Sequence, residues 1–276
     1  MAMMNKELLA LYGMKFNPFI QEVPVEALHV YPKLKEFFWQ IENSLIREGG
    51  FALVSGDPGS GKSVALRLLS EKLSTIRDIN IGVITRPSSG ISDFYRELGE
   101  MFGVPLNAHN RWNAFKQLRE RWINHVHNTL VRPVLFIDEA QGAAHCLFNE
   151  LRLLTSAEFD SRQLMSIVMA GDKRLNDKLR SDELLPLGSR IRVRLNLDYS
   201  SISQLKESLQ YLVDASGNPN LMTSQLIQTL CEHSAGNYRV LCNMANTLLI
   251  TGMKKEKSQL DEQLYFDCFD TNSHKR

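Results

Sequence analysis

Short apolar runs alternate with amphipathic stretches over the first two thirds of the chain. The apolar runs are rich in β-branched and aliphatic residues and predict buried strands at 51–55, 79–85, 134–137 and 165–170. Around them, apolar residues recur at helical spacing and predict helices at 6–12, 33–48, 91–102, 112–127 and 146–154. Strands that alternate with helices predict the α/β class, with a parallel sheet covered by helices on both faces.

The pattern changes near residue 197, after which helical periodicity dominates. Helices are predicted at 202–215, 223–233, 239–253 and 260–269, and glycine-asparagine pairs separate some of them. The chain is therefore expected to have three parts. These are an N-terminal helical segment at 1–50, an α/β core at 51–197 and a small all-α domain at 198–276.

A glycine-rich loop follows the first predicted strand and leads into a helix. Its sequence fits the pattern G-x-x-x-x-G-K-[ST], with Gly56, Asp57, Pro58, Gly59, Ser60, Gly61, Lys62 and Ser63. Backbone amides of such a loop and the N-terminus of the next helix, near Val64, bind phosphate groups. We expect Lys62 to reach the β- and γ-phosphates of ATP and Ser63 to bind Mg²⁺. The alternative is a glycine turn before an ordinary helix.

Two acids follow a later buried strand, well beyond the glycine loop in the sequence. Asp138 stands where a carboxylate would help to hold Mg²⁺, and Glu139 where one would orient and polarise the attacking water. The alternative is a pair of acids that caps a helix. Together with the loop, the pair predicts an enzyme that hydrolyses ATP to ADP and phosphate.

Arginines near the end of the α/β core are candidates for stabilising the γ-phosphate. Arg190, Arg192 and Arg194 alternate in an extended segment and are expected on one side of it. Phosphoryl transfer often uses a cation from a neighbouring subunit, and Arg190 is the first choice, with Arg192 second. Arg239 opens a later helix, where a cation is unfavourable to the helix dipole, so a functional role is expected. The alternatives are ion pairs within the chain and solvated side chains.

Composition narrows the setting of these motifs. The 276 residues are 43% hydrophobic and carry a formal net charge of +1, so any nucleic-acid contact requires a local basic patch. The four cysteines form no C-x-x-C pair, which argues against zinc and a disulfide framework. No apolar run approaches the ~18 residues of a membrane span, and the start of the chain lacks a secretory signal. A cytoplasmic protein without a membrane partner is expected.

Taken in order, the motifs resemble those of the AAA+ ATPases over roughly residues 14–255. The loop at 56–63 resembles Walker A, residues 135–139 resemble Walker B, Arg190 resembles the arginine finger, and 236–239 resemble sensor 2. The resemblance implies a P-loop NTPase core followed by a helical lid, with ATP and Mg²⁺ bound between them. In relatives of the initiator clade the segment before Walker A binds the base, which implies that Phe16 and Pro18 lie near the adenine.

Sensor 1 is where the chain departs from this pattern. The family usually places a small polar residue at the end of the strand predicted at 165–170. Asp172 is the nearest polar residue here, and an acid would repel phosphate. Slow hydrolysis, as in a molecular timer, would fit this departure.

Two short segments resemble one branch of AAA+ proteins. They are Phe16-Asn17-Pro18-Phe19 and Asp138-Glu139-Ala140-Gln141. The branch holds the ExeA/GspA-type secretion ATPases and the transposition ATPases of the TnsC, TniB and MuB type. Its secretion members carry a membrane helix and a peptidoglycan-binding module after the ATPase, and this sequence shows neither.

The preferred hypothesis is therefore an ATP-dependent regulator of DNA transposition. It would oligomerise as a ring or helical filament on double-stranded DNA, select the target and recruit a transposase. The alternatives are a secretion-associated ATPase and a signalling ATPase without a DNA partner.

A DNA-binding surface is expected after the second predicted strand, the region that lines the central channel in filament-forming relatives. Arg86 follows that strand, and Arg111, Lys116 and Arg119 form a stripe on the next long helix. Its aromatic residues, Trp112, Phe115 and Trp122, are expected to face the core. The alternative is a solvated helix face, and Glu120 dilutes the charge.

Overall fold

The computed structural model describes residues 2–106 and 110–269, which form two compact units. One unit comprises 31–58 and 62–197. The other contains 59–61 and the described parts of 1–30 and 198–276. The larger part of the second unit starts at residue 198. The N-terminal segment expected at 1–50 is instead divided, because the chain up to Val30 belongs to the helical unit.

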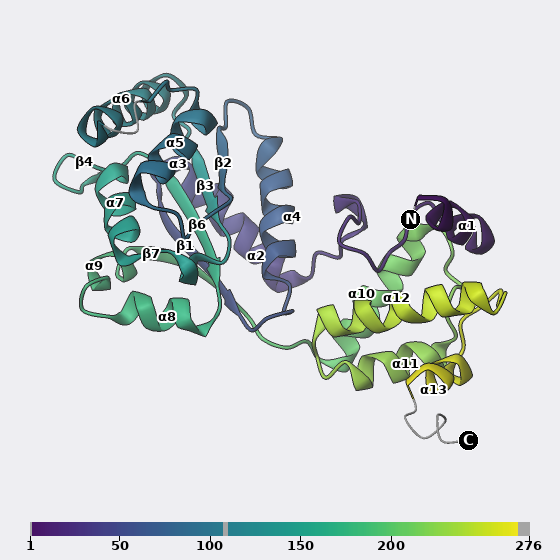
Figure 1. Cartoon of the computed structure of the whole chain (residues 1–276). Coiled ribbons are helices and arrows are strands. Elements are labelled where there is room, and N and C mark those ends of the chain that lie inside the picture. Colours follow the sequence, from purple (N-terminus) through teal and green to yellow (C-terminus); the bar gives the residue numbers. More distant parts are fainter. Residues whose placement is uncertain (1, 107–109, 270–276) are drawn as a thin grey trace. The chain divides into compact units, whose positions relative to one another are not determined.

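The α/β unit is built on five parallel strands in the order β2-β3-β6-β1-β7 (Figure 1). They are β1 (Gly50–Gly56), β2 (Ile81–Ile84), β3 (Val134–Ile137), β6 (Ser166–Gly171) and β7 (Ile191–Leu197). The central strands β3 and β6 are buried along their whole length, as their continuous apolar sequences predict. The predicted parallel sheet is confirmed, and it brings the carboxyl ends of β1, β3 and β6 side by side.

Helices cover both faces of this sheet, as Figure 1 shows. One face carries α2 (Pro32–Gln40) and α4 (Lys62–Ser74); the other carries α5 (Ile91–Phe102), α6 (Arg111–Thr129), α7 (His145–Thr155), α8 (Lys173–Arg180) and α9 (Leu185–Gly188). On the second face, Leu53, Ile137 and Met169 of the sheet pack in one core with Leu98 and Trp122. Full burial of a side chain of this size stabilises the fold by about 1.5–3 kcal/mol.

Two local features differ from the periodicity of the sequence. The helix predicted at 33–48 is continuous but contains a π-helical stretch, Ile41–Leu45, between α2 and α3 (Ile46–Glu48). A small antiparallel hairpin, β4 (Ser156–Ala157) and β5 (Arg162–Gln163), precedes β6 and was not predicted. Its turn is strained, because Glu158, Phe159 and Asp160 all have positive φ.

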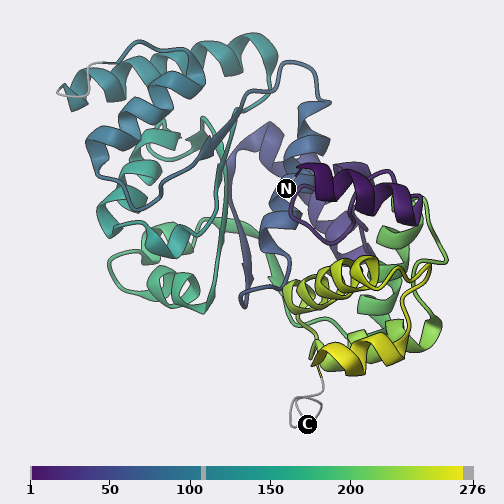
Figure 2. The same ribbon diagram turned by 45° about the vertical axis from the view of Figure 1, so that its right-hand side comes forward.

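The helical unit contains α1 (Ala2–Tyr12), α10 (Ile202–Ser216), α11 (Ser224–His233), α12 (Tyr238–Lys254), α13 (Glu262–Phe269) and the 3-10 turn η1 (Val25–Ala27). Figure 2 shows α1 against the C-terminal helices. Leu8, Tyr12 and Phe19 are buried in the same core as Leu209 and Leu248, which explains why the start of the chain joins this unit. Side-chain caps start α10, α11 and α12, the first through a reciprocal capping box.

Candidate active site

The phosphate loop surrounds a buried cation. Lys62 is only 7% exposed, and its Nζ donates to the carbonyl oxygens of Gly56 (3.0 Å) and Asp57 (3.2 Å). Within the part of the chain that the structure describes, Lys62 has no ion-pair partner. The hydroxyl of Ser60 is also buried without a hydrogen-bond partner. Burying an ammonium group that forms no ion pair is costly, so this loop suits an anionic ligand.

The start of α4 and the end of β3 meet at a pair of oxygen donors. Ser63 Oγ donates to Asp138 Oδ2 at 2.6 Å. A hydroxyl and a carboxylate are hard oxygen ligands, which suit Mg²⁺ held by few protein groups together with phosphate and water. No cluster of three or more His, Cys, Asp or Glu ligands occurs in residues 2–106 and 110–269. The oxygen atoms of Ser63 and Asp138 suit the Mg²⁺ of a nucleotide, to which phosphate and water are also ligands.

Glu139 follows Asp138 in a left-handed backbone conformation, with φ 51° and ψ 36°. Its side chain is exposed and caps no helix; its Oε2 accepts a hydrogen bond from Gln141 Nε2 at 2.5 Å. Asp138 Oδ1 accepts from the backbone N–H of Glu139 at 2.8 Å, and α7 starts after Ala144. Glu139 thus occupies the N-cap position of the 3-10 turn Ala140–Gly142, but its side chain makes no capping hydrogen bond there.

The end of β6 carries an acid that is already paired. Asp172 caps α8 and accepts from Arg174 Nε (3.0 Å) and Nη2 (2.6 Å). The hydrogen bond from the Arg174 side chain lowers the pKa of Asp172, so the carboxylate stays ionised beside its cation. The repulsion expected of an unpaired acid at the sensor 1 position is thus offset by Arg174. An arginine two residues after the acidic N-cap residue is the sequence signal that could have indicated the pair of Asp172 and Arg174.

The arginine cluster is divided between strand and turn. Since β7 starts at Ile191, Arg192 and Arg194 share its exposed face, whereas Arg190 lies in the turn before it. Arg190 forms an ion pair with Asp160 at the hairpin turn, and burial lowers its pKa. Arg192 Nη1 donates to Glu48 at 2.5 Å. The expectation that the three arginines share one side of the strand is wrong for Arg190, and Arg190 and Arg192 have partners within the chain.

The remaining nucleotide candidates lie in the helical unit. Arg239 is exposed in the first turn of α12, where the Asn237 side chain accepts from its backbone N–H at 3.0 Å. Phe16 is half-buried and Pro18 is buried. Between them, Asn17 Nδ2 donates to Asn246 Oδ1 at 2.9 Å, which fixes this segment on α12. Contact of these residues with a nucleotide stays a prediction.

The stripe on α6 is only partly available to DNA. Arg111 Nε donates at 3.1 Å to Glu150, a 4%-exposed carboxylate that also accepts from Tyr95. Arg119 donates to the carbonyl oxygens at the end of α7 and is partly buried, which lowers its pKa. Both arginines therefore attach α6 to α7. Lys116 is exposed and lies 3.8 Å from Glu120.

The aromatic residues of α6 also differ from expectation. Trp122 is buried as expected, but Trp112 is 75% exposed and stacks on the half-buried ring of Phe115 with a centroid distance of 6.0 Å. The expectation that Trp112 faces the core is wrong. Helical periodicity does not show that an aromatic residue in the first turn of α6 stays exposed.

Arg111 is expected to matter for stability. Arg111→Met would leave the buried Glu150 carboxylate without its cation and lower the free energy of unfolding by about 1–3 kcal/mol. The exposed Lys116→Met should change it by less than about 0.5 kcal/mol. Urea unfolding of both variants tests this, and equal stabilities would contradict the structural role of Arg111.

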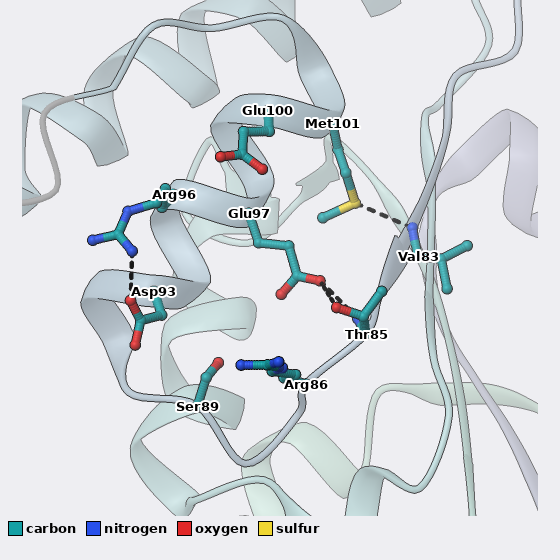
Figure 3. Close-up of a pocket in the computed structure, with 9 residues that line it drawn as sticks. All are labelled: Val83, Thr85, Arg86, Ser89, Asp93, Arg96, Glu97, Glu100 and Met101. Carbon is teal, nitrogen blue, oxygen red and sulfur yellow. Dashed lines mark hydrogen bonds and ion pairs between the residues drawn. The ribbon is translucent and has the colours of Figure 1, made fainter.

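Arg86 lies in a pocket between β2 and α5, shown in Figure 3, with a volume of about 500 Å³. Glu97 Oε1 accepts from the backbone N–H and the hydroxyl of Thr85, both at 2.7 Å, and Met101 Sδ accepts from the Val83 N–H at 3.1 Å. Side chains of α5 thus accept hydrogen bonds from backbone amides of the edge strand β2 and of the residue that follows it. The pocket also contains three acids, Asp93, Glu97 and Glu100. It is therefore a surface of mixed charge.

Comparison with known proteins gives the same fold. Residues 46–179 match the family described as AAA domain. The general secretion pathway protein A of Aeromonas hydrophila is 26% identical over 248 residues, which cover 88% of this chain and 44% of that protein. The chain thus spans less than half the length of this relative.

Solved structures of low sequence identity share the fold. The Cdc6p of Pyrobaculum aerophilum superposes with a TM-score of 0.68 at 15% identity, and the match covers 88% of this chain and 67% of that one. The Aeropyrum pernix ORC2 protein superposes with a TM-score of 0.69 at 13% identity, and the match covers 94% of this chain and 72% of that one. A chain of Drosophila ORC bound to DNA superposes with a TM-score of 0.68 at 15% identity, and the match covers 95% of this chain and 64% of that one.

Across residues 2–106 and 110–269, no helix combines the length and apolarity needed to cross a membrane.

Proposed function

Because the chain carries an AAA domain with a P-loop NTPase fold, we propose that it binds and hydrolyses Mg²⁺·ATP. The loop at 56–63 and Lys62 would hold the phosphates, with Val64 behind them in α4. Ser63 and Asp138 would hold Mg²⁺, which would neutralise phosphate charge. Glu139 would orient the attacking water.

The contact between Ser63 and Asp138 carries this proposal. Ser63 Oγ and Asp138 Oδ2 lie 2.6 Å apart, although the two residues are 75 positions apart in the sequence. They meet because β1, which leads into the loop before Ser63, and β3, which precedes Asp138, are parallel strands of one sheet. The buried Lys62, whose Nζ donates to loop carbonyls, supports the same site. Both features suit a triphosphate with its metal.

Assembly is the second part of the proposal. Arg190 of an adjacent subunit and Arg239 of the same chain would sense the γ-phosphate, so that ATP joins subunits into a ring or filament. Arg190 would first have to leave Asp160, which makes the ion pair a competitor of assembly. The finger thus becomes available only when a neighbouring site offers a stronger anion.

The finer proposal is regulation of DNA transposition in the cytoplasm. Assembly on double-stranded DNA would recruit a transposase, and hydrolysis would release the protein. ORC proteins with this fold have been solved bound to DNA, which supports a DNA partner. Arg86 and Lys116 are the candidates whose charges face solvent, while Arg111 and Arg119 are engaged internally. A secretion-associated ATPase is the second candidate function, favoured by the similarity to general secretion pathway protein A.

Electron microscopy with linear duplex DNA tests the proposal. The protein would be imaged with ATP, with a slowly hydrolysed analogue and with ADP. Rings or filaments on DNA only with the triphosphates are expected. Nucleotide binding without DNA-dependent assembly would contradict the transposition role and favour a secretion or signalling ATPase.

A further inference from the structure

The short turn after β3 carries a glutamine whose side chain connects two strand ends of the site. We infer that Gln141 is a positioning residue that holds the Glu139 carboxylate in its working orientation, an inference that rests on the proposed ATP hydrolysis. Its Nε2 donates to Glu139 Oε2 at 2.5 Å, and its Oε1 accepts from the backbone N–H of Asp172 at a longer 3.4 Å. The amide thus donates to Glu139, which follows β3, and accepts from Asp172, which follows β6.

The backbone of the turn aims this side chain. The left-handed conformation of Glu139 folds the chain back and brings the side chains of residues 139 and 141 together. For a residue with a side chain, such a conformation is strained and requires support from its surroundings. That support comes from α8, where Lys178 Nζ donates to the carbonyl oxygens of Gln141 and Ala143, both at 2.7 Å. Gln141 therefore projects from a fixed backbone.

Gly171 provides the space that the Gln141 amide occupies. A Cβ atom at Gly171 would lie 2.6 Å from Gln141 Oε1, closer than real Cβ contacts allow. The glycine lies in the last position of β6, and its φ is not positive, so backbone conformation does not require it. The close approach of Gln141, together with that of the Leu175 side chain, therefore accounts for a glycine at this position.

The chemistry of a primary amide suits this position. Glu139 is exposed, and a glutamate in water samples several rotamers, so a donor on one oxygen restricts its orientation. Gln141 is neutral, so it directs the carboxylate without forming an ion pair. Arg174, the nearby cation, is held mainly by Asp172, which together with the field of Glu139 raises the pKa of Arg174. Glu139 is thus oriented by an amide and left free of a direct salt bridge among the described residues.

Three variants and a control test the inference through ATP turnover and nucleotide affinity. Gln141→Ala should lower kcat about tenfold, the lower end of what one hydrogen bond to a charged group contributes, and leave affinity within about twofold. Gln141→Glu preserves the shape but places two carboxylates together. It should also lower kcat and move the acidic side of the pH–rate profile to higher pH. Gln210→Ala, on the exposed face of α10, is the matched control and should behave as wild type.

A double variant separates positioning from a general structural effect. In the Glu139→Gln background, Gln141→Ala should cause no further loss, because the two residues act as one unit. Wild-type turnover by Gln141→Ala, a loss of affinity, or an equal loss in both backgrounds would overturn the inference alone. A wild-type chain that releases no phosphate would overturn the proposed hydrolysis as well. Thermal melting within a few degrees of wild type should accompany the expected result.

Discussion

Replacing Glu139 by glutamine is expected to lower ATP turnover by about 10²–10⁴-fold while nucleotide binding persists, the usual contribution of a residue that accepts a proton from the nucleophile. Glutamine preserves the shape of the side chain but is a poor proton acceptor. Because the side chain is exposed and caps no helix, stability should change by less than about 0.5 kcal/mol. Phosphate release and nucleotide titration of the same preparation measure the two effects.

An exposed glutamate of α4 provides the control for this variant. Glu71→Gln removes a charge of the same kind at the surface and should retain full turnover. Under the proposed function, Glu139→Gln assemblies on DNA should also be long-lived, since hydrolysis disassembles them. Loss of nucleotide binding in Glu139→Gln, or normal turnover, would show that the catalytic role assigned to Glu139 is wrong.

The second large effect is expected at Lys62. Lys62→Ala should weaken ATP binding by about 10- to 150-fold, since a hydrogen bond to a charged group contributes about 1.5–3 kcal/mol. Assembly should be lost with it, because ATP joins the subunits in the proposed mechanism. Nucleotide titration and electron microscopy of the same variant measure both losses.

Folding of the Lys62 variant should not account for this loss. The ammonium group is buried against carbonyl oxygens and has no ion pair among the described residues, so its removal relieves a desolvation cost. We expect the melting temperature to stay the same or to rise. Lys35→Ala, at an exposed position of α2, is the matched control. Unaltered assembly of Lys62→Ala on DNA would contradict the idea that ATP joins subunits.

Much of the fold could be predicted because its signals are local. The strands β1, β3 and β6 are short apolar runs, and the phosphate loop is a contiguous pattern that has one common structural use. The amphipathic helices α5 and α6 lie close to the expected bounds. The parallel order of the strands then places Ser63 and Asp138 together at the carboxyl ends of β1 and β3, as the motif spacing predicts.

The supporting residues of the site could not be predicted, because their partners are distant in the sequence. Nothing near Gln141 indicates that Lys178 fixes its backbone, and nothing near Arg111 indicates a buried Glu150. The same limit applies to Trp112, because helical spacing alone does not show that a residue in the first turn of α6 stays exposed. It also explains why the sequence pattern does not assign α1 to the helical domain, since α1 packs on helices from the opposite end of the chain.

Release of phosphate from ATP by the purified chain, measured with Mg²⁺ and after chelation, tests the central claim most directly. The Ser63–Asp138 site predicts hydrolysis that requires Mg²⁺, is lost on chelation and returns when Mg²⁺ is added back. With Mg²⁺ and ATP near the wild-type KM, Lys62→Ala and Glu139→Gln should both release phosphate at least about tenfold more slowly than the wild type. Only Glu139→Gln should bind ATP with wild-type affinity. Hydrolysis that persists without a divalent metal, or at the wild-type rate in both variants, would contradict the assignment of this edge of the sheet as the ATPase site.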